Sequence, residues 1–139
     1  MFANQFFYPL AIYALLTASL VGLVFGYRTA LVLLRRSAAN VWPRSKPAVE
    51  PAIIQRAHDA HKNAVETFPL YLVAILLLSN NHELLLQWGW IISWLVGARL
   101  IQSTIHVVGT QASMVFARGL FFAVQLFGLA SIIVLAVLK

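Results

Sequence analysis

Four long runs of apolar residues, joined by short polar segments, constrain the fold of this chain more than any other feature. The runs cover approximately residues 6–34, 52–79, 84–108 and 115–138. An α-helix needs about 20 predominantly apolar residues to cross the hydrocarbon core of a bilayer, and each run is long enough. Because 61% of the 139 residues are hydrophobic and only 10% are charged, a soluble domain of this size could not bury so much apolar surface. The sequence therefore predicts an integral membrane protein with four transmembrane helices.

The connections between the runs predict how the helices are arranged. A proline-containing segment at 35–51 joins the first two runs, and tight turns at 80–83 and 109–114 join the others. Short connections place consecutive helices side by side and antiparallel. We therefore expect one membrane domain over residues 1–139, with an all-α, up-down four-helix bundle. The first run lacks a basic leading segment and is longer than the apolar part of a signal peptide, so we expect it to be retained as a span.

The basic residues predict the orientation of the bundle. One group falls at the end of the bundle that carries the first and third connections: Arg28, Arg35, Arg36, Arg44, Lys46, Arg56, Lys62, Arg99 and Arg118. Only Lys139 falls at the other end. The positive-inside rule then places both connections in the cytoplasm and both termini on the non-cytoplasmic side. The net charge of +6 is explained by this topology and by an anionic ligand, so a nucleic-acid partner is not expected.

The first half of the second run, RAHDAHKNAVE at 56–66, is unusually polar for a membrane span. At 100° per residue, Arg56, Asp59, Lys62, Asn63 and Glu66 share one helical face. Each charge at membrane depth costs roughly 2.5–3.5 kcal/mol on insertion scales, so these groups should pair or bind something. The charges could neutralise one another, Arg56 with Asp59 and Lys62 with Glu66. Alternatively, Arg56, Asn63 and Glu66 form part of a binding site, because Glu66 lies two to three turns inside the helix.

The third and fourth runs also carry polar side chains at helical spacing: Arg99, Gln102, Ser103 and His106 in the third, Arg118 and Gln125 in the fourth. Hydrogen bonds between helices would account for the two amides and the hydroxyl. The two arginines have no carboxylate nearby in the sequence. Arginine can make two parallel hydrogen bonds to a carboxylate, so we expect a small ligand that bears carboxylates or phosphate. No metal site is expected from the histidine spacing, and because the chain has no cysteine, any thiol must come with the ligand.

Three segments resemble motifs of the MAPEG family, the membrane-associated proteins of eicosanoid and glutathione metabolism. AHKNAVETFP (60–69) resembles the second-span signature, VGAR (96–99) the start of the third-span motif, and ARGLFFAV (117–124) the fourth-span segment. The last segment is most similar to microsomal glutathione transferases, and among these we favour the bacterial-type branch. The resemblance implies a homotrimer of four-helix bundles in membrane lipid, with glutathione bound between neighbouring subunits.

The resemblance also implies roles for individual residues. It assigns a glutathione-binding role to six side chains: Arg28, Arg56, His61, Asn63, Glu66 and Arg99. It sets Arg118 against the glutathione sulfur, where a guanidinium favours the reactive thiolate over a thiol whose ordinary pKa is about 8.5. His106 stands where catalytic members usually carry a tyrosine, and it could donate a hydrogen bond to the thiolate or act as an acid or base.

Two functions from different classes follow. The first is a glutathione-dependent transferase or peroxidase that acts on lipophilic electrophiles, including lipid hydroperoxides, with Arg118 and His106 as catalytic residues. The second is a non-catalytic MAPEG-like subunit or scaffold within a larger membrane complex. Two departures from the family pattern motivate the second: the histidine at 106, and its spacing of twelve positions from Arg118, which is wider than expected.

Overall fold

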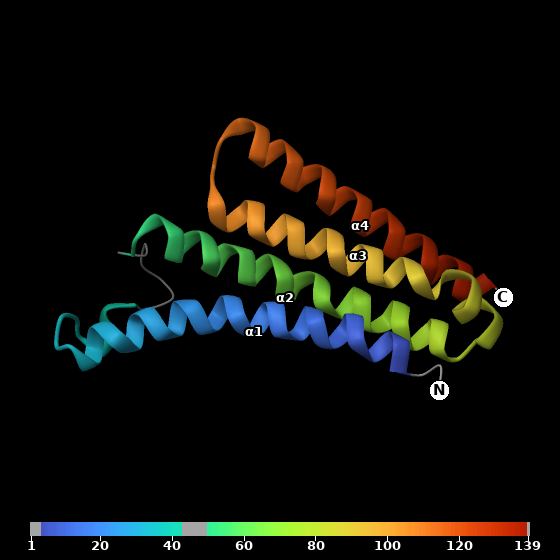
Figure 1. The fold of residues 1–139 in the computed structure, drawn as a ribbon, viewed down its shortest axis with the longest axis horizontal. Helices are drawn as coiled ribbons and strands as arrows, with labels where there is room; N and C mark the ends of the chain where they lie inside the picture. Colours follow the sequence, from blue (N-terminus) through green and yellow to red (C-terminus); the bar gives the residue numbers. More distant parts are fainter. Residues whose placement is uncertain (1–3, 43–49, 139) are drawn as a thin grey trace.

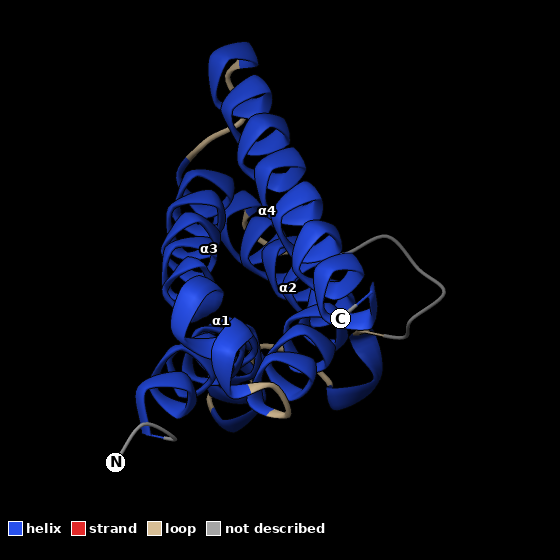
Figure 2. Cartoon of the chain, turned by 90° about the vertical axis from the view of Figure 1, so that its right-hand side faces the viewer, coloured by secondary structure: helices blue, strands red, loops and turns tan. Residues whose placement is uncertain are grey.

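The structure, a computed structural model, describes residues 4–42 and 50–138 and is built from four long helices. The elements in chain order are α1 (Asn4–Leu33), the short 3₁₀ helix η1 (Ala39–Val41), α2 (Ala52–Ser79), α3 (His82–Val108) and α4 (Ala112–Leu138). The four long helices run up and down (Figure 1), and the described part of the chain contains no strand (Figure 2). Each of the four is long and apolar enough to cross a membrane. The predicted fold class, an all-α bundle of four membrane-spanning helices, is confirmed.

The first helix ends at the two arginines where the sequence predicts its end. Arg35 adopts φ 56°, the left-handed conformation that commonly follows a helix and usually belongs to glycine. The Arg36 N–H donates to the Leu31 carbonyl at 2.8 Å, and the Arg35 N–H donates to the Val32 carbonyl at 3.0 Å. These two bonds form a Schellman motif, which satisfies carbonyls that the helix end would otherwise leave free. Of the basic residues used to predict the orientation, Arg44, Lys46 and Lys139 lie outside the described residues.

The third helix begins at His82, two residues before the predicted start at 84, because a polar side chain caps it. The Asn81 side chain accepts a hydrogen bond from the Leu84 N–H at 3.2 Å, which is a favourable N-cap arrangement. Glu83 in the first turn adds a negative charge where the helix dipole favours it. Hydropathy alone misses this polar first turn, and it likewise places the start of α4 at 115 instead of Ala112.

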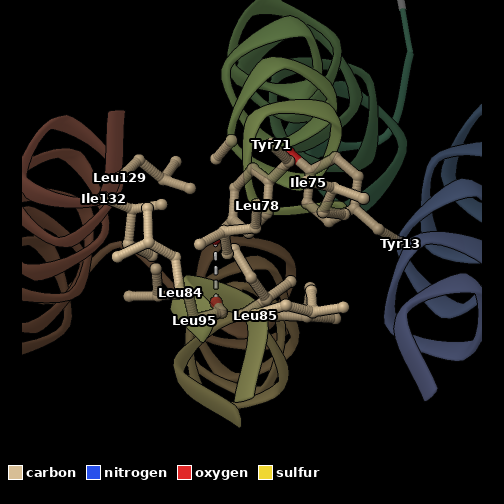
Figure 3. Close-up of a cluster of buried hydrophobic side chains, with 12 residues drawn as sticks. Tyr13, Tyr71, Ile75, Leu78, Leu84, Leu85, Leu95, Leu129 and Ile132 are labelled. Atoms are coloured by element: carbon tan, nitrogen blue, oxygen red, sulfur yellow. Dashed lines mark hydrogen bonds between the residues drawn. The ribbon is translucent and has the colours of Figure 1, made fainter. Parts of the chain in front are cut away.

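The apolar core lies between α2 and α3, with α1 and α4 packed against them. Figure 3 shows Tyr71, Ile75 and Leu78 of α2 meeting Leu84, Leu85 and Leu95 of α3, with Leu129 and Ile132 of α4 on one side and Tyr13 of α1 on the other. Many large apolar side chains point outward instead, among them Trp94, Phe116 and Phe127. This outward apolar surface is what a lipid solvent requires.

The fourth helix is not parallel to the rest of the bundle. In Figure 1, α4 is inclined to α3 and diverges from it toward the α3–α4 connection, at the end where α1 finishes and α2 begins. At the opposite end α4 closes onto the core through Leu129 and Ile132. This divergence determines where the bundle is open, and the predicted polar residues of α2, α3 and α4 lie in that half.

Candidate functional site

A buried arginine forms the centre of a polar network inside the bundle. Arg99 is only 1% exposed, yet no carboxylate of the described residues pairs with it. Its Nε donates to Tyr13 Oη at 3.0 Å, its Nη1 to Gln102 Oε1 at 2.7 Å, and its Nη2 to the Asn63 carbonyl at 3.2 Å. The Cζ atom also lies 5.8 Å from the centroid of the Tyr13 ring. All three guanidinium nitrogens are therefore used by neutral groups of α1, α2 and α3.

Two tyrosines extend this network through the core. Tyr13 Oη donates to the Ala64 carbonyl at 2.8 Å, and its ring stacks on that of Tyr71 with centroids 4.7 Å apart. Tyr71 Oη lies 2.9 Å from the Leu95 carbonyl and 3.0 Å from Gln125 Oε1. Neither tyrosine was among the residues predicted to form polar contacts. A hydroxyl within an apolar membrane run was the available signal, since it must find a partner inside the protein.

The glutamine of α3 connects the network to α4. Gln102 Oε1 accepts from Arg99 and from Gln125 Nε2, the latter at 3.0 Å, and Gln102 Nε2 donates to the Arg118 carbonyl at 3.2 Å. Hydrogen bonding between helices, predicted for the polar uncharged residues, is confirmed for Gln102 and Gln125. Ser103 is buried but makes no side-chain hydrogen bond to any residue in the described ranges.

An open cleft of about 340 Å³ lies between α2, α3 and α4, in the half of the bundle where α4 diverges. Its volume falls in the range of about 300–1,000 Å³ that small-molecule pockets occupy. One residue from α2, two from α3 and four from α4 line it: Asn63, Gln102, His106, Val115, Arg118, Gly119 and Phe122. The polar wall comes mainly from α2 and α3, and α4 supplies an apolar wall with one arginine.

The polar groups of the cleft have unused hydrogen-bonding capacity. The half-buried guanidinium of Arg118 makes no hydrogen bond or ion pair with any described residue, and the same holds for the side chains of Asn63 and His106. No carboxylate is among the residues that line the cleft. Three separate helices thus bring a cation, an imidazole and an amide to one opening without neutralising them. Such a site suits an anion that can accept several hydrogen bonds.

The structure places Arg28, another predicted ligand-binding residue, away from the cleft. Its Nε donates to Glu50 Oε1 at 2.5 Å, and its Cζ lies 5.8 Å from the centroid of the Trp42 ring. The Glu50 side chain is fully buried, so a buried carboxylate and a half-exposed arginine neutralise each other. This pair ties the end of α1 to the segment that leads into α2.

The other predicted residues of α2 divide between the interior and the outer surface. Arg56 Nε donates to the Val107 carbonyl of α3 at 2.7 Å, and His61 Nδ1 lies 3.0 Å from the Thr17 carbonyl of α1. Because a carbonyl only accepts, His61 carries its proton on Nδ1 in this contact. Glu66 is exposed on the outer face of α2 and has no partner among the described residues.

The charge pairs predicted within α2 are wrong in detail. Arg56 does not pair with Asp59, and Lys62 does not pair with Glu66. Instead Lys62 Nζ lies 4.0 Å from Asp59 Oδ1, and both side chains are 59% exposed. A pair this long and this exposed contributes little to stability.

Comparison with known proteins identifies the family. The MAPEG family model matches residues 6–138, which is nearly the whole chain. No curated protein and no solved structure shows a significant match. The matched region contains the core of all four spans, the buried network and every residue that lines the cleft. Because the family model matches nearly the whole chain, and because the chain forms a bundle of four helices long and apolar enough to span a membrane, the chain belongs to the MAPEG family.

Proposed function

We propose that this protein is a glutathione-dependent membrane enzyme of the microsomal glutathione transferase kind, which conjugates or reduces lipophilic electrophiles. Glutathione occupies the cleft between α2, α3 and α4, with its sulfur against Arg118. The proposal rests on the guanidinium of Arg118, which no described residue binds and which lies in an open cleft without a carboxylate among its lining residues.

The residues of the cleft fit the chemistry of glutathione. The tripeptide has two carboxylates, an amine and a thiol. Arg118, His106 and Asn63 provide unused donors for the anionic groups, and Glu66, three residues after Asn63 on α2, provides an exposed carboxylate for the amine. Arginine and carboxylate groups recognise such partners through charge-assisted hydrogen bonds.

The exposed charges of α2 support the homotrimer that the family resemblance implies. Asp59, Lys62 and Glu66 are exposed on a helix that is long and apolar enough to span a membrane. Ionisable side chains are costly in contact with lipid and usually face protein or water. In the proposed assembly this face packs against a neighbouring subunit, and glutathione binds between the two. We also propose that both termini lie on the non-cytoplasmic side, so that the cleft half faces the cytoplasm.

The proposed chemistry depends on forming a thiolate. A cysteine thiol with a pKa of about 8.5 is mostly protonated at neutral pH, and a fixed guanidinium stabilises the thiolate electrostatically. The sulfur then attacks the electrophile, which reaches it along the apolar wall formed by Val115 and Phe122. His106 lines the same cleft and donates a hydrogen bond to the thiolate or a proton to the leaving group.

A glutathione titration of the purified protein in detergent tests this proposal, with the ultraviolet absorbance of the thiolate as the readout. We expect a saturable rise for the wild type. Arg118→Ala should abolish most of this rise, because without the guanidinium the bound thiol returns toward its ordinary pKa of about 8.5. Arg36→Ala, which removes an exposed arginine beyond α1, is the matched control and should behave like the wild type. A full thiolate signal in folded Arg118→Ala would remove Arg118 from the proposed role.

The second candidate function is a non-catalytic subunit or scaffold of a larger membrane complex. The observation that favours it is His106, which stands in the cleft where catalytic relatives usually carry tyrosine. A flat titration by wild-type protein, together with stoichiometric co-purification of other membrane proteins, would support this function. Isolation of a single homogeneous oligomer that responds to glutathione would contradict it.

A further inference from the structure

The glycine that follows Arg118 has no packing role within the described chain. A Cβ atom added at Gly119 would meet no atom within 4 Å. Gly128 on the same helix is different, because its Cβ would come within 2.9 Å of Leu95 Cδ2. Packing against α3 therefore explains Gly128 but not Gly119. Gly22, Gly26 and Gly97 have the same open space around a Cβ atom, but of these four glycines only Gly119 lines the cleft.

The position of Gly119 in the cleft supplies a reason. Val115, Gly119 and Phe122 lie at i, i+4 and i+7 on α4, so they share one helical face, and all three line the cleft. The missing side chain makes a notch between two apolar residues. Arg118 is the adjacent residue, so the notch lies next to the guanidinium.

We infer that Gly119 determines how bulky an electrophile the cleft accepts, an inference that rests on the proposed function. The notch seats the apolar group on the carbon that the sulfur attacks, which favours electrophiles with a branched or aromatic substituent there. In a substitution, the sulfur forms a bond to that carbon and the leaving group departs with the bonding electron pair. The thiol proton passes to water, and no oxidant or reductant is required.

The inference is tested by measuring how the purified protein in detergent binds glutathione, S-methylglutathione and S-benzylglutathione, which present increasing bulk on the sulfur. Calorimetry would give the dissociation constants for the wild type, Gly119→Ala and Gly119→Val. Gly26→Ala and Gly26→Val are matched controls, because a Cβ at Gly26 of α1 also meets no atom within 4 Å and Gly26 does not line the cleft. Alanine favours the helix more than glycine does, so Gly119→Ala should fold.

We expect Gly119→Val to raise the dissociation constant of S-benzylglutathione by roughly tenfold or more relative to that of glutathione. One extra or missing methylene group in an apolar pocket has an effect of this size. Gly119→Ala should show a smaller loss in the same direction, and the Gly26 variants should keep the wild-type ratio.

Three outcomes would overturn the inference. If Gly119→Val still binds glutathione and keeps the wild-type ratio of the S-benzylglutathione and glutathione dissociation constants, the inference is wrong and the proposed function is unaffected. An equal loss for all ligands with a changed oligomer size would make Gly119 a packing residue against a second copy. Absence of glutathione binding by the wild type would remove the proposed function, and this inference with it.

Discussion

Two arginines on neighbouring helices, Arg99 and Arg118, have opposite environments. Arg99 is enclosed, and each of its nitrogens donates to a neutral acceptor inside the bundle. Arg118 is half-buried in an open cleft and donates to no described residue. Both are cations within membrane spans, and neither has a carboxylate partner in the part of the chain that the structure describes. The difference separates two uses of a cation in a span: Arg99 is a structural centre of the bundle, and Arg118 is a candidate for binding a ligand because its hydrogen-bonding groups remain unused.

The two regions are connected through one side chain. The amide oxygen of Gln102 accepts from Arg99, which fixes the orientation of the amide, and its nitrogen then donates to the Arg118 carbonyl. The backbone of Arg118 is thus held by the network while its side chain stays free. Binding groups carried on a rigid support lose less freedom when a ligand binds.

The largest expected effect comes from truncating the enclosed arginine. Arg99→Ala should lower the free energy of unfolding by about 3–5 kcal/mol, because it leaves a cavity and removes donors from buried acceptors. Arg118→Ala should change it by about 0.5 kcal/mol or less, since no described group loses a partner. Denaturant unfolding in detergent micelles measures both. Equal losses in the two variants would show that the regions do not differ as described.

A smaller loss of stability is expected from removing the hydroxyl that Arg99 uses. Tyr13→Phe should cost about 2 kcal/mol, because hydrogen bonds to charged groups contribute about 1.5–3 kcal/mol. Tyr71→Phe is the matched control and should cost about 1 kcal/mol, the scale of neutral hydrogen bonds between membrane helices. The same unfolding assay ranks the two variants. A greater loss in Tyr71→Phe would place the centre of the network at Gln125 instead of Arg99.

The smallest effect on stability is expected in the cleft. Asn63→Ala removes an unpartnered amide but keeps the carbonyl that accepts from Arg99, so unfolding should change by about 0.5 kcal/mol or less. Glutathione affinity should fall about five- to tenfold, equivalent to about 1 kcal/mol for one hydrogen bond. The thiolate titration measures the affinity, with exposed Asn80→Ala as the control. Strong destabilisation with unchanged affinity would move Asn63 from the cleft to the buried network.

Much of the fold was predictable because lipid imposes a simple rule on the sequence. Long apolar runs predict the four helices, and the structure confirms them. The prediction for Gln102 and Gln125 also succeeded, since an amide in a span has few alternatives to a partner on another helix. The positions of Asn63, His106 and Arg118 within their spans placed them toward the same end of the bundle, and the structure brings these three together in one cleft.

The partners of Arg56 and Arg99 could not be predicted from the sequence, and the reason is physical. Tyr13 lies 86 residues before Arg99 in the chain. The partner of Arg56 is the backbone carbonyl of Val107, and every residue has such a carbonyl, so the sequence does not indicate which one will accept. Periodicity gives the face of one helix but not the rotation of its neighbours. For the same reason, pairing within α2 was expected for Arg56, although its actual partner is on α3.

The buried position of Arg99 has a consequence for how the protein is made. A lone arginine at the centre of a span raises the free energy of insertion by roughly 2.5–3.5 kcal/mol. The acceptors on other helices that Arg99 uses, the Tyr13 hydroxyl and the Asn63 carbonyl, belong to α1 and α2, which leave the ribosome before α3. The order of synthesis therefore places the acceptors in the bilayer before the cation arrives. The same four helices connected with α3 first would have to insert this charge before either acceptor was present.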